Sequence, residues 1–302
     1  MIQQSTHKMS FGQYMKKHFS LYLFVAPFMV IFFVFTVLSV LMSMGLSFTQ
    51  FNVLEPPKFV FIDNYLRLFL DDETFLIAVK NTIILSVIIG PLGYILSFLF
   101  AWFINELGPK TRSLVTLVFY APTIAGNLYY IWGIIFSSDS YGYVNAILMK
   151  LNIIQAPILW FQNTQYMMPL IILVALWSSL GTSFLTFIAG LQGVDRSQIE
   201  AASVDGISNR WQELLHITLP SMGPQLLFGA VMQIASSFAA GDICVAFAGN
   251  PSTDYSAATI LTHIYDVSGR YEMGYACAIS TVLFIMMLFA NWGIRKILNK
   301  YL

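Results

Sequence analysis

The sequence predicts an all-α protein that crosses a membrane six times. The 302 residues are 57% hydrophobic and only 10% charged, whereas soluble proteins average about 25% charged residues. The hydrophobic residues gather into intervals close to the roughly 20 residues that a helix needs to cross a bilayer. In lipid a helix satisfies its own backbone polar groups, so each interval is expected to be helical.

The six intervals divide the chain into three parts. Residues 1–19 form a short basic segment that we expect in the cytoplasm. Residues 20–75 hold the first helix and an outside loop; the apolar run is too long for a cleaved signal peptide, so this helix should be retained. Residues 76–298 form the core. Its helices are expected at about 81–105, 113–137, 166–190, 221–247 and 273–294.

The positive residues predict the orientation, because cytoplasmic loops carry an excess of Lys and Arg. With the N-terminus in the cytoplasm, ten of the 15 Lys and Arg residues lie inside. They are Lys8, Lys16, Lys17, Lys110, Arg112, Arg196, Arg210, Arg295, Lys296 and Lys300. Both termini and the polar stretch 200–220 are then cytoplasmic.

Composition and motifs argue against several kinds of function. The formal net charge is zero, which gives no indication of nucleic-acid binding. The two cysteines and four histidines have no metal-ligand spacing, so no metal is expected. The chain has no nucleotide-binding glycine loop and no recognisable catalytic motif. We therefore expect no enzyme activity and no cofactor in this chain, and any work driven by ATP would need another subunit.

The polar stretch reads as two short helices between membrane spans. Asp195 can cap the first helix, with Gln198 completing a capping box. Gly206 suits the left-handed turn that ends this helix. Ser208 is the expected cap of the second helix, and Pro220 lies where the next span begins. Such a hairpin is expected to dock a partner in the water phase; the alternative is an amphipathic segment lying on the lipid surface.

The first short helix has the side chains of a docking surface. Ala201 and Ala202 are small and let a partner approach closely, while Glu200 and Asp205 offer charges to it. The second helix has an apolar face that includes Leu214.

At these residues the sequence resembles the EAA signature of ABC importer permeases. The resemblance rests on Glu200-Ala201-Ala202, Asp205-Gly206, Ile217 and Leu219-Pro220. Further segments resemble the carbohydrate-uptake, maltose-type branch, which depends on a binding protein. They are Phe24-Val25-Ala26-Pro27-Phe28, Asn64-Tyr65, Asn81-Thr82, Ile131-Trp132, Tyr141-Gly142-Tyr143-Val144-Asn145 and Gly249-Asn250-Pro251-Ser252-Thr253. The sequence departs from the signature at Asp195, Ile207 and Leu214, where proline, alanine and phenylalanine are common.

The resemblance implies a type I ABC importer permease fold in a bacterial plasma membrane. It implies a heterodimer with a second homologous permease, two cytoplasmic ATPase subunits that bind ATP and Mg, and an extracellular solute-binding protein. The ATPase-coupling residues would be Glu200, Ala201, Ala202, Asp205, Gly206, Leu214 and Pro220. The implied solute is a sugar or oligosaccharide; a polyol phosphate stays open as an alternative.

Side chains that bind sugars are aromatic or form hydrogen bonds. The candidates for lining the path of the solute through the membrane are Tyr120, Asn127, Tyr130, Trp177, Gln233 and Asp242. An acid at membrane depth is costly and usually faces a cavity or a partner, which singles out Asp242. The alternative is that Asp242 lies solvated near the outer interface or bonds a neighbouring subunit. A secondary transporter would need ion-coupling acids in matching halves of the chain, and Asp242 is the only acid placed deep in a predicted span.

Overall fold

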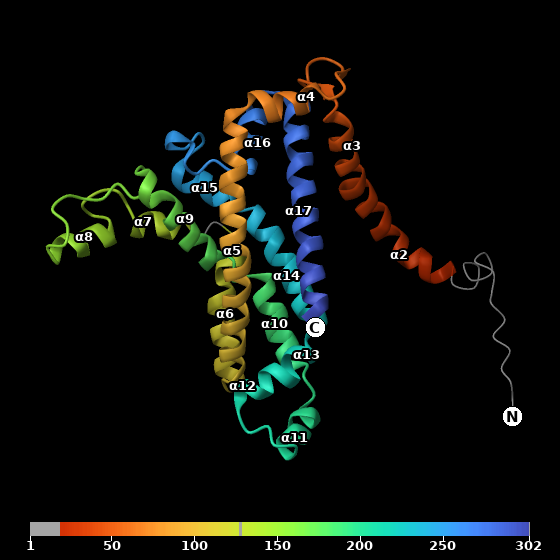
Figure 1. Ribbon diagram of the computed structural model, residues 1–302, viewed down its shortest axis with the longest axis vertical. Coiled ribbons are helices and arrows are strands. Elements are labelled where there is room, and N and C mark those ends of the chain that lie inside the picture. Colours follow the sequence, from red (N-terminus) through yellow and green to blue (C-terminus); the bar gives the residue numbers. More distant parts are fainter. Residues whose placement is uncertain (1–18, 127–128, 302) are drawn as a thin grey trace.

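A computed structural model describes residues 19–126 and 129–301. Within these residues, five helical segments are long and apolar enough to cross a membrane. They are Phe19–Leu46, Glu73–Asn105, Thr164–Gln192, Gly223–Ala248 and Met273–Lys300. Figure 1 shows four of them gathered in a bundle, with the first segment standing apart.

The first segment is built from α2 (Phe19–Phe32), the π-helical turn η1 (Phe33–Val37) and α3 (Leu38–Leu46). α3 contacts α17 (Met273–Tyr301), whereas α2 diverges from the bundle (Figure 1). None of its most apolar window is buried against the rest of the chain. Outside the contact between α3 and α17, the apolar side chains of this segment therefore face lipid or another protein.

Long helices with buried apolar faces form the centre of the bundle. α5 (Glu73–Asn105) packs against α10 (Thr182–Gln192) and α14 (Gly223–Phe238), which also pack against each other. Phe184 and Phe187 of α10 are fully buried in this contact, beside Tyr94 and Phe98 of α5. Together with α17 and α9 (Thr164–Ser178), these helices contribute most residues of the three buried hydrophobic clusters, and η2 (Arg67–Asp71), α15 (Gly241–Ala248) and α16 (Ile260–Gly269) contribute others.

The expected third helix, 113–137, is interrupted. The structure has α6 (Pro109–Ile124) and the short α7 (Tyr130–Ile135) in its place. Gly126 has a φ of +62°, the left-handed conformation that glycine adopts without strain, so the helix ends before it. The 16 residues of α6 extend about 24 Å, less than the roughly 30 Å of a hydrocarbon core.

The expected fourth helix, 166–190, is also two helices, because residues 179–181 separate α9 from α10. The last helix is longer than expected, since α17 continues to Tyr301 rather than ending near residue 294.

Short elements cover the two ends of the bundle (Figure 1). One end carries the two-residue strands β1 (Thr49–Gln50) and β2 (Lys58–Phe59), α4 (Asp63–Leu66), η2 (Arg67–Asp71) and α16 (Ile260–Gly269). α8 (Tyr143–Lys150) projects sideways, and α15 (Gly241–Ala248) and η5 (Thr253–Tyr255) lead into α16. The opposite end carries α11 (Arg196–Val204), α12 (Arg210–Glu213), η4 (Leu214–Thr218) and α13 (Leu219–Ser221).

Candidate functional site

The polar hairpin begins with a well-capped helix, α11. The side chain of Asp195 accepts a hydrogen bond from the backbone of Ser197 at 2.9 Å, and this bond lowers the pKa of Asp195. At the other end Gly206 has a φ of +99°. The amides of Gly206 and Ile207 donate to the carbonyls of Ser203 and Ala202, at 3.4 and 3.0 Å. This is the pattern of a Schellman motif, so the predicted role of Gly206 agrees with the geometry.

The second half of the hairpin starts one residue later than expected. Asn209, not Ser208, is the N-cap of α12, and its side chain accepts from the amide of Trp211 at 3.1 Å. Asn209 serves as the cap because it has the extended backbone that an N-cap requires. From here α12, η4 and α13 lead directly to α14, so the hairpin joins one of the central helices.

Two contacts join the hairpin to the end of α5. Nη2 of Arg210 lies 3.1 Å from Oε2 of Glu106, and its Nη1 lies 2.9 Å from Oε2 of Glu213. The rings of Trp211 and Trp102 lie 5.0 Å apart. Sequence reasoning missed both contacts, because 104 positions separate Arg210 from Glu106 and no periodicity relates them. Their effect is to hold the hairpin against the bundle.

The predicted coupling residues divide into an exposed and a buried group. Glu200, Ala201 and Asp205 are exposed, and Ala202 is half-buried. Leu214 is 3% exposed, so its side chain packs inside the chain. Pro220 is exposed just before the start of α14. The exposed candidates other than Pro220 therefore lie on α11 or directly after it.

The predicted path residues do not form one group. Gln233 is buried between α14 and α5 and donates to the carbonyl of Ile89 at 3.3 Å, which is a helix-packing role. Tyr120 is half-buried on α6, apart from the others. Asn127 lies outside the described residues.

Three path candidates, Tyr130, Trp177 and Asp242, lie on α7, α9 and α15, whose residues pack in one hydrophobic cluster. Tyr130 contacts Tyr129, whose ring lies 6.1 Å from that of Phe247 on α15, the helix of Asp242. The ring of Trp177 on α9 lies 5.7 Å from that of Trp132 on α7. Oδ1 of Asp242 accepts a hydrogen bond of 2.8 Å from the hydroxyl of Tyr265, and Asp242 is exposed. The ring of Tyr130 and the carboxylate of Asp242 are both exposed, and groups of these two kinds can bind a polyhydroxylated solute.

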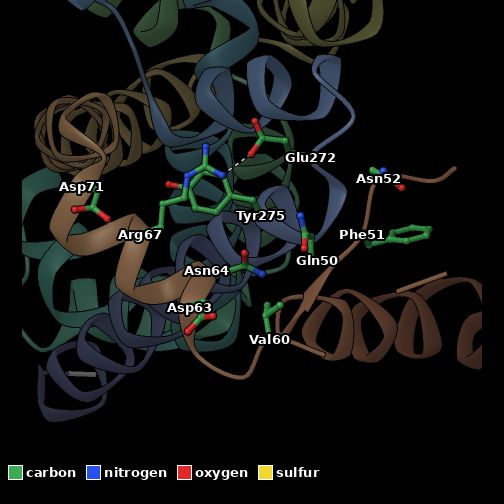
Figure 2. A pocket seen from close by; sticks show the side chains of 10 residues that line it. All are labelled: Gln50, Phe51, Asn52, Val60, Asp63, Asn64, Arg67, Asp71, Glu272 and Tyr275. Atoms are coloured by element: carbon green, nitrogen blue, oxygen red, sulfur yellow. Dashed lines mark hydrogen bonds and ion pairs between the residues drawn. The ribbon is translucent and has the colours of Figure 1, made fainter. Parts of the chain in front are cut away.

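A further polar cluster lies near β1, at the end of the bundle opposite the hairpin. Arg67 forms an ion pair with Glu272 and lies over the ring of Tyr275, 4.1 Å from its centroid. Figure 2 shows these side chains at a polar pocket between α4, η2 and the start of α17, with Asn64 and Asp63 on its wall. Behind it, Asp72 accepts from Tyr275 at 2.6 Å. Sequence reasoning missed this cluster too, because its members come from distant segments.

No three His, Cys, Asp or Glu side chains of the described residues are close enough together to hold a metal ion.

Comparisons with known proteins agree on one family. The chain is 34% identical over 272 residues to a probable ABC transporter permease, YesP, of Bacillus subtilis, covering 88% of this chain and 86% of YesP. It is 30% identical to the arabinooligosaccharides transport permease AraP of the same species, covering 88% and 84%. It is 28% identical to the lactose transport permease LacF of Rhizobium radiobacter, covering 88% and 89%. No family model matches the sequence.

The fold agrees with a solved transporter. A chain in the crystal structure of a bacterial ABC transporter that imports the acidic polysaccharide alginate superposes with a TM-score of 0.72 and 26% identity, covering 95% of this chain and 98% of that one. The same kind of alginate transporter, solved with a pentasaccharide-bound periplasmic protein, gives a TM-score of 0.73 at 24% identity, covering 95% and 98%. The relatives are transport permeases rather than enzymes. The chain is a membrane protein of the ABC transporter permease family.

Proposed function

We propose that this chain is one of two permease subunits of a binding-protein-dependent ABC importer, and that it forms half of the path for a sugar or oligosaccharide. The observation that carries the proposal is the hairpin: a capped, exposed α11 whose following helices are joined to α5 and continue to α14. Two relatives, AraP and LacF, are transport permeases for arabinooligosaccharides and lactose, which supports a sugar as the solute of this chain.

The remaining parts of the importer are separate subunits. A second, homologous permease would complete the path, and two cytoplasmic ATPases would bind ATP and Mg and each grip one hairpin. An extracellular binding protein would deliver the solute; the alginate transporter forms a complex with such a periplasmic protein. In this arrangement both termini are cytoplasmic and the chain crosses the membrane six times, with α6 and α7 completing the third crossing.

The hairpin would transmit movement because it is attached at both of its ends. α10 leads directly to α11, and α13 leads directly to α14. ATP binding that moves α11 would thus move two central helices together. A ligand shifts an equilibrium only through different affinity for two states, so the ATPase must contact α11 differently in the inward-facing and outward-facing states.

The charge near the candidate path favours a neutral solute over a polyol phosphate. The carboxylate of Asp242 is exposed and would repel a phosphate. A secondary transporter would need paired coupling acids, and the family to which the chain belongs argues against that class.

The test is to change α11 and measure its coupling to the ATPase. Gly206→Val forces a β-branched residue to a φ of +99°, and Glu200→Lys reverses an exposed charge. We expect both variants to insert in the membrane but to lose uptake, with weaker ATPase retention or less hydrolysis in response to loaded binding protein. Gly108→Val, at an extended glycine with open space around it outside the hairpin, is the matched control for Gly206→Val. Normal uptake by both α11 variants would show that the hairpin is only a connector.

A further inference from the structure

The end of the bundle opposite the hairpin carries more acidic than basic residues. Residues 49–80 and 249–275 supply most of the elements at this end (Figure 1), and they contain eight Asp or Glu residues but only four Lys or Arg residues. Three of the basic residues already form ion pairs within this end. The pairs are Lys58 with Glu55, Arg67 with Glu272 and Arg270 with Asp266. The excess of negative charge is therefore not compensated within this end of the chain.

Two of the uncompensated acids lie on the wall of the polar pocket that Figure 2 shows. The pocket has a volume of about 450 Å³, and Asp63 and Asp71 line it four residues before and four residues after Arg67. Arg67 pairs with Glu272 instead. Among the described residues, no ion pair or hydrogen bond involves the side chain of Asp63 or Asp71. Three carboxylates thus line the pocket against one guanidinium group, and its net charge is negative.

The remaining polar groups of the pocket are suited to a basic side chain. Nδ2 of Asn64 donates to the carbonyls of Ser47 and Thr49 at 2.8 and 2.9 Å, which fixes this side chain against β1 and leaves its oxygen to accept. Gln50 supplies a second carboxamide oxygen. Such oxygens accept hydrogen bonds from an ammonium or guanidinium group, and the carboxylates attract its charge. The pocket therefore suits the end of a Lys or Arg side chain.

Exposed apolar side chains lie on the segment that forms one wall of the pocket. Leu54 is 88% exposed, and the exposed ring of Phe59 lies 6.2 Å from that of Phe61. Val53 has a φ of +69°, which costs free energy in a β-branched residue. Large apolar groups exposed together on one surface mark a site of interaction with another molecule. The pocket and this apolar segment form one surface that combines negative charge with apolar contacts.

The position of this surface favours a partner in the water phase. Figure 1 shows β1, β2 and α4 at the end of the bundle rather than along its sides. A second permease crosses the same membrane, so it would pack against the sides of the long helices. A phospholipid would bring its phosphate group to a pocket of negative charge, which is unfavourable. A protein with a basic and partly apolar surface satisfies both the charge and the exposed apolar groups.

We propose that this surface docks the extracellular solute-binding protein, and that the pocket accepts a Lys or Arg side chain of that protein. The carboxylates of Asp63 and Asp71 pair with the incoming cation, and apolar side chains of the partner cover Leu54 and Phe59. The negative charge of this end also accelerates the approach of a basic partner. The choice of partner rests on the proposed function, in which this end of the chain is extracellular.

The test is photo-crosslinking in intact cells that carry the whole importer. A benzophenone amino acid replaces Leu54, and the adducts formed on irradiation are identified by mass spectrometry. We expect an adduct with a solute-binding protein, joined through a peptide of its surface that contains Lys or Arg. Asp63→Asn and Asp71→Asn together should lower the yield of this adduct by roughly ten-fold. Asp63→Glu and Asp71→Glu together keep the charge and should keep most of the yield.

Two controls accompany this measurement. Glu73→Gln and Asp254→Asn together remove the same charge from the same end at exposed positions outside the pocket, and they should keep most of the yield. In a second set of cells the benzophenone amino acid replaces Val204, which is exposed in the hairpin. It should capture the ATPase equally in every variant, which shows that the importer has assembled.

Several results would overturn the proposal. One is an adduct at Leu54 with only a second permease or lipid, or no adduct at all. Another is a yield that the Asp63 and Asp71 variants leave unchanged, or an equal loss in the control variants. If Leu54 captures the binding protein but Val204 does not capture the ATPase, the docking surface stands and the proposed role of the hairpin fails. The two failures are therefore distinguishable.

Discussion

The carboxylate of Asp72 and the imidazole of His263 lie 2.9 Å apart, although 191 positions separate them in the chain. Oδ2 of Asp72 also accepts from the hydroxyl of Tyr275 at 2.6 Å, and Oδ1 caps α5 by accepting from the amide of Phe75 at 2.9 Å. One mostly buried carboxylate thus joins the start of α5 to α16 and α17.

Asp72→Asn should destabilise the protein, and the loss should depend on pH. Burial raises the pKa of Asp72, but the hydrogen bonds from Tyr275, Phe75 and His263 outweigh it, and the pKa lies below its ordinary value. The stabilisation by Asp72 is therefore present at neutral pH and is lost as the pH falls below about 3.9 and through the lower folded pKa. We expect Asp72→Asn to cost about 1–3 kcal/mol at pH 7.

Thermal unfolding of the purified protein in detergent would check this. The difference in Tm between wild type and Asp72→Asn should narrow in acid. Asp71→Asn, at the exposed neighbour, should have little effect at any pH. A difference that is the same at pH 7 and pH 3 would contradict the assigned role of the carboxylate.

Gly93→Ala should weaken the contact between α5 and α14. A Cβ at Gly93 would overlap the amide of Gln233 and lie 2.6 Å from Oγ of Ser179, and both of these side chains are buried. Overpacking of this kind costs about 1–3 kcal/mol. Gly293→Ala, where nothing lies within 4 Å, is the control. The double variant Gly93→Ala/Gln233→Ala should recover thermal stability relative to Gly93→Ala, and its failure to do so would place the strain elsewhere.

Trp211→Ala should disturb the hairpin more than Arg210→Met. The Arg210 and Glu106 side chains are 62% and 46% exposed, and such ion pairs contribute at most about 1 kcal/mol. The Trp211–Trp102 pair adds about 0.5–1.5 kcal/mol beyond the burial of its rings. We expect stimulated ATPase activity to fall by roughly five-fold or more in Trp211→Ala and less than that in Arg210→Met. The reverse order would mean that charge, not ring packing, positions the hairpin.

Asp242→Leu should impair uptake much more than Asp242→Asn. Asparagine still accepts the hydrogen bond from Tyr265, whereas leucine cannot. Asp242 could act through its hydrogen bond with Tyr265 or through its carboxylate. Tyr265→Phe distinguishes these two roles, because it removes the hydrogen bond and keeps the carboxylate. If uptake by Tyr265→Phe is normal while Asp242→Leu is inactive, the carboxylate acts on the path. Normal uptake by both Asp242 variants would remove Asp242 from the path.

Cysteine labelling tests the orientation. Ser208→Cys in the hairpin should resist a membrane-impermeant thiol reagent in intact cells, while Ser138→Cys should react. Both should react after permeabilisation, which is the control for exposure. The two native cysteines, Cys244 and Cys277, are replaced by serine beforehand. Reversed labelling would contradict both the cytoplasmic termini and the docking role of the hairpin.

The sequence alone determined the features that depend on composition and local backbone chemistry. Uncharged apolar runs predicted the long helices, and the cap at Asp195 and the turn at Gly206 were visible because capping acts within a few residues. The same local rules placed the second cap at Ser208, one residue before Asn209, since both residue types are suitable caps. The coupling roles of Glu200 and Asp205 remain predictions.

Only the tertiary structure decided which side chains meet. Nothing in the sequence relates Asp72 to His263 or Arg210 to Glu106, because contacts between segments depend on how the helices pack. Packing also separated the proposed path residues, burying Gln233 between helices and leaving Asp242 exposed. The interrupted third helix has the same origin: hydropathy measures apolar length, whereas the break before Gly126 is set by backbone conformation. Lipid requires that a spanning helix be apolar, but the neighbouring helices decide where it bends and which side chains it buries.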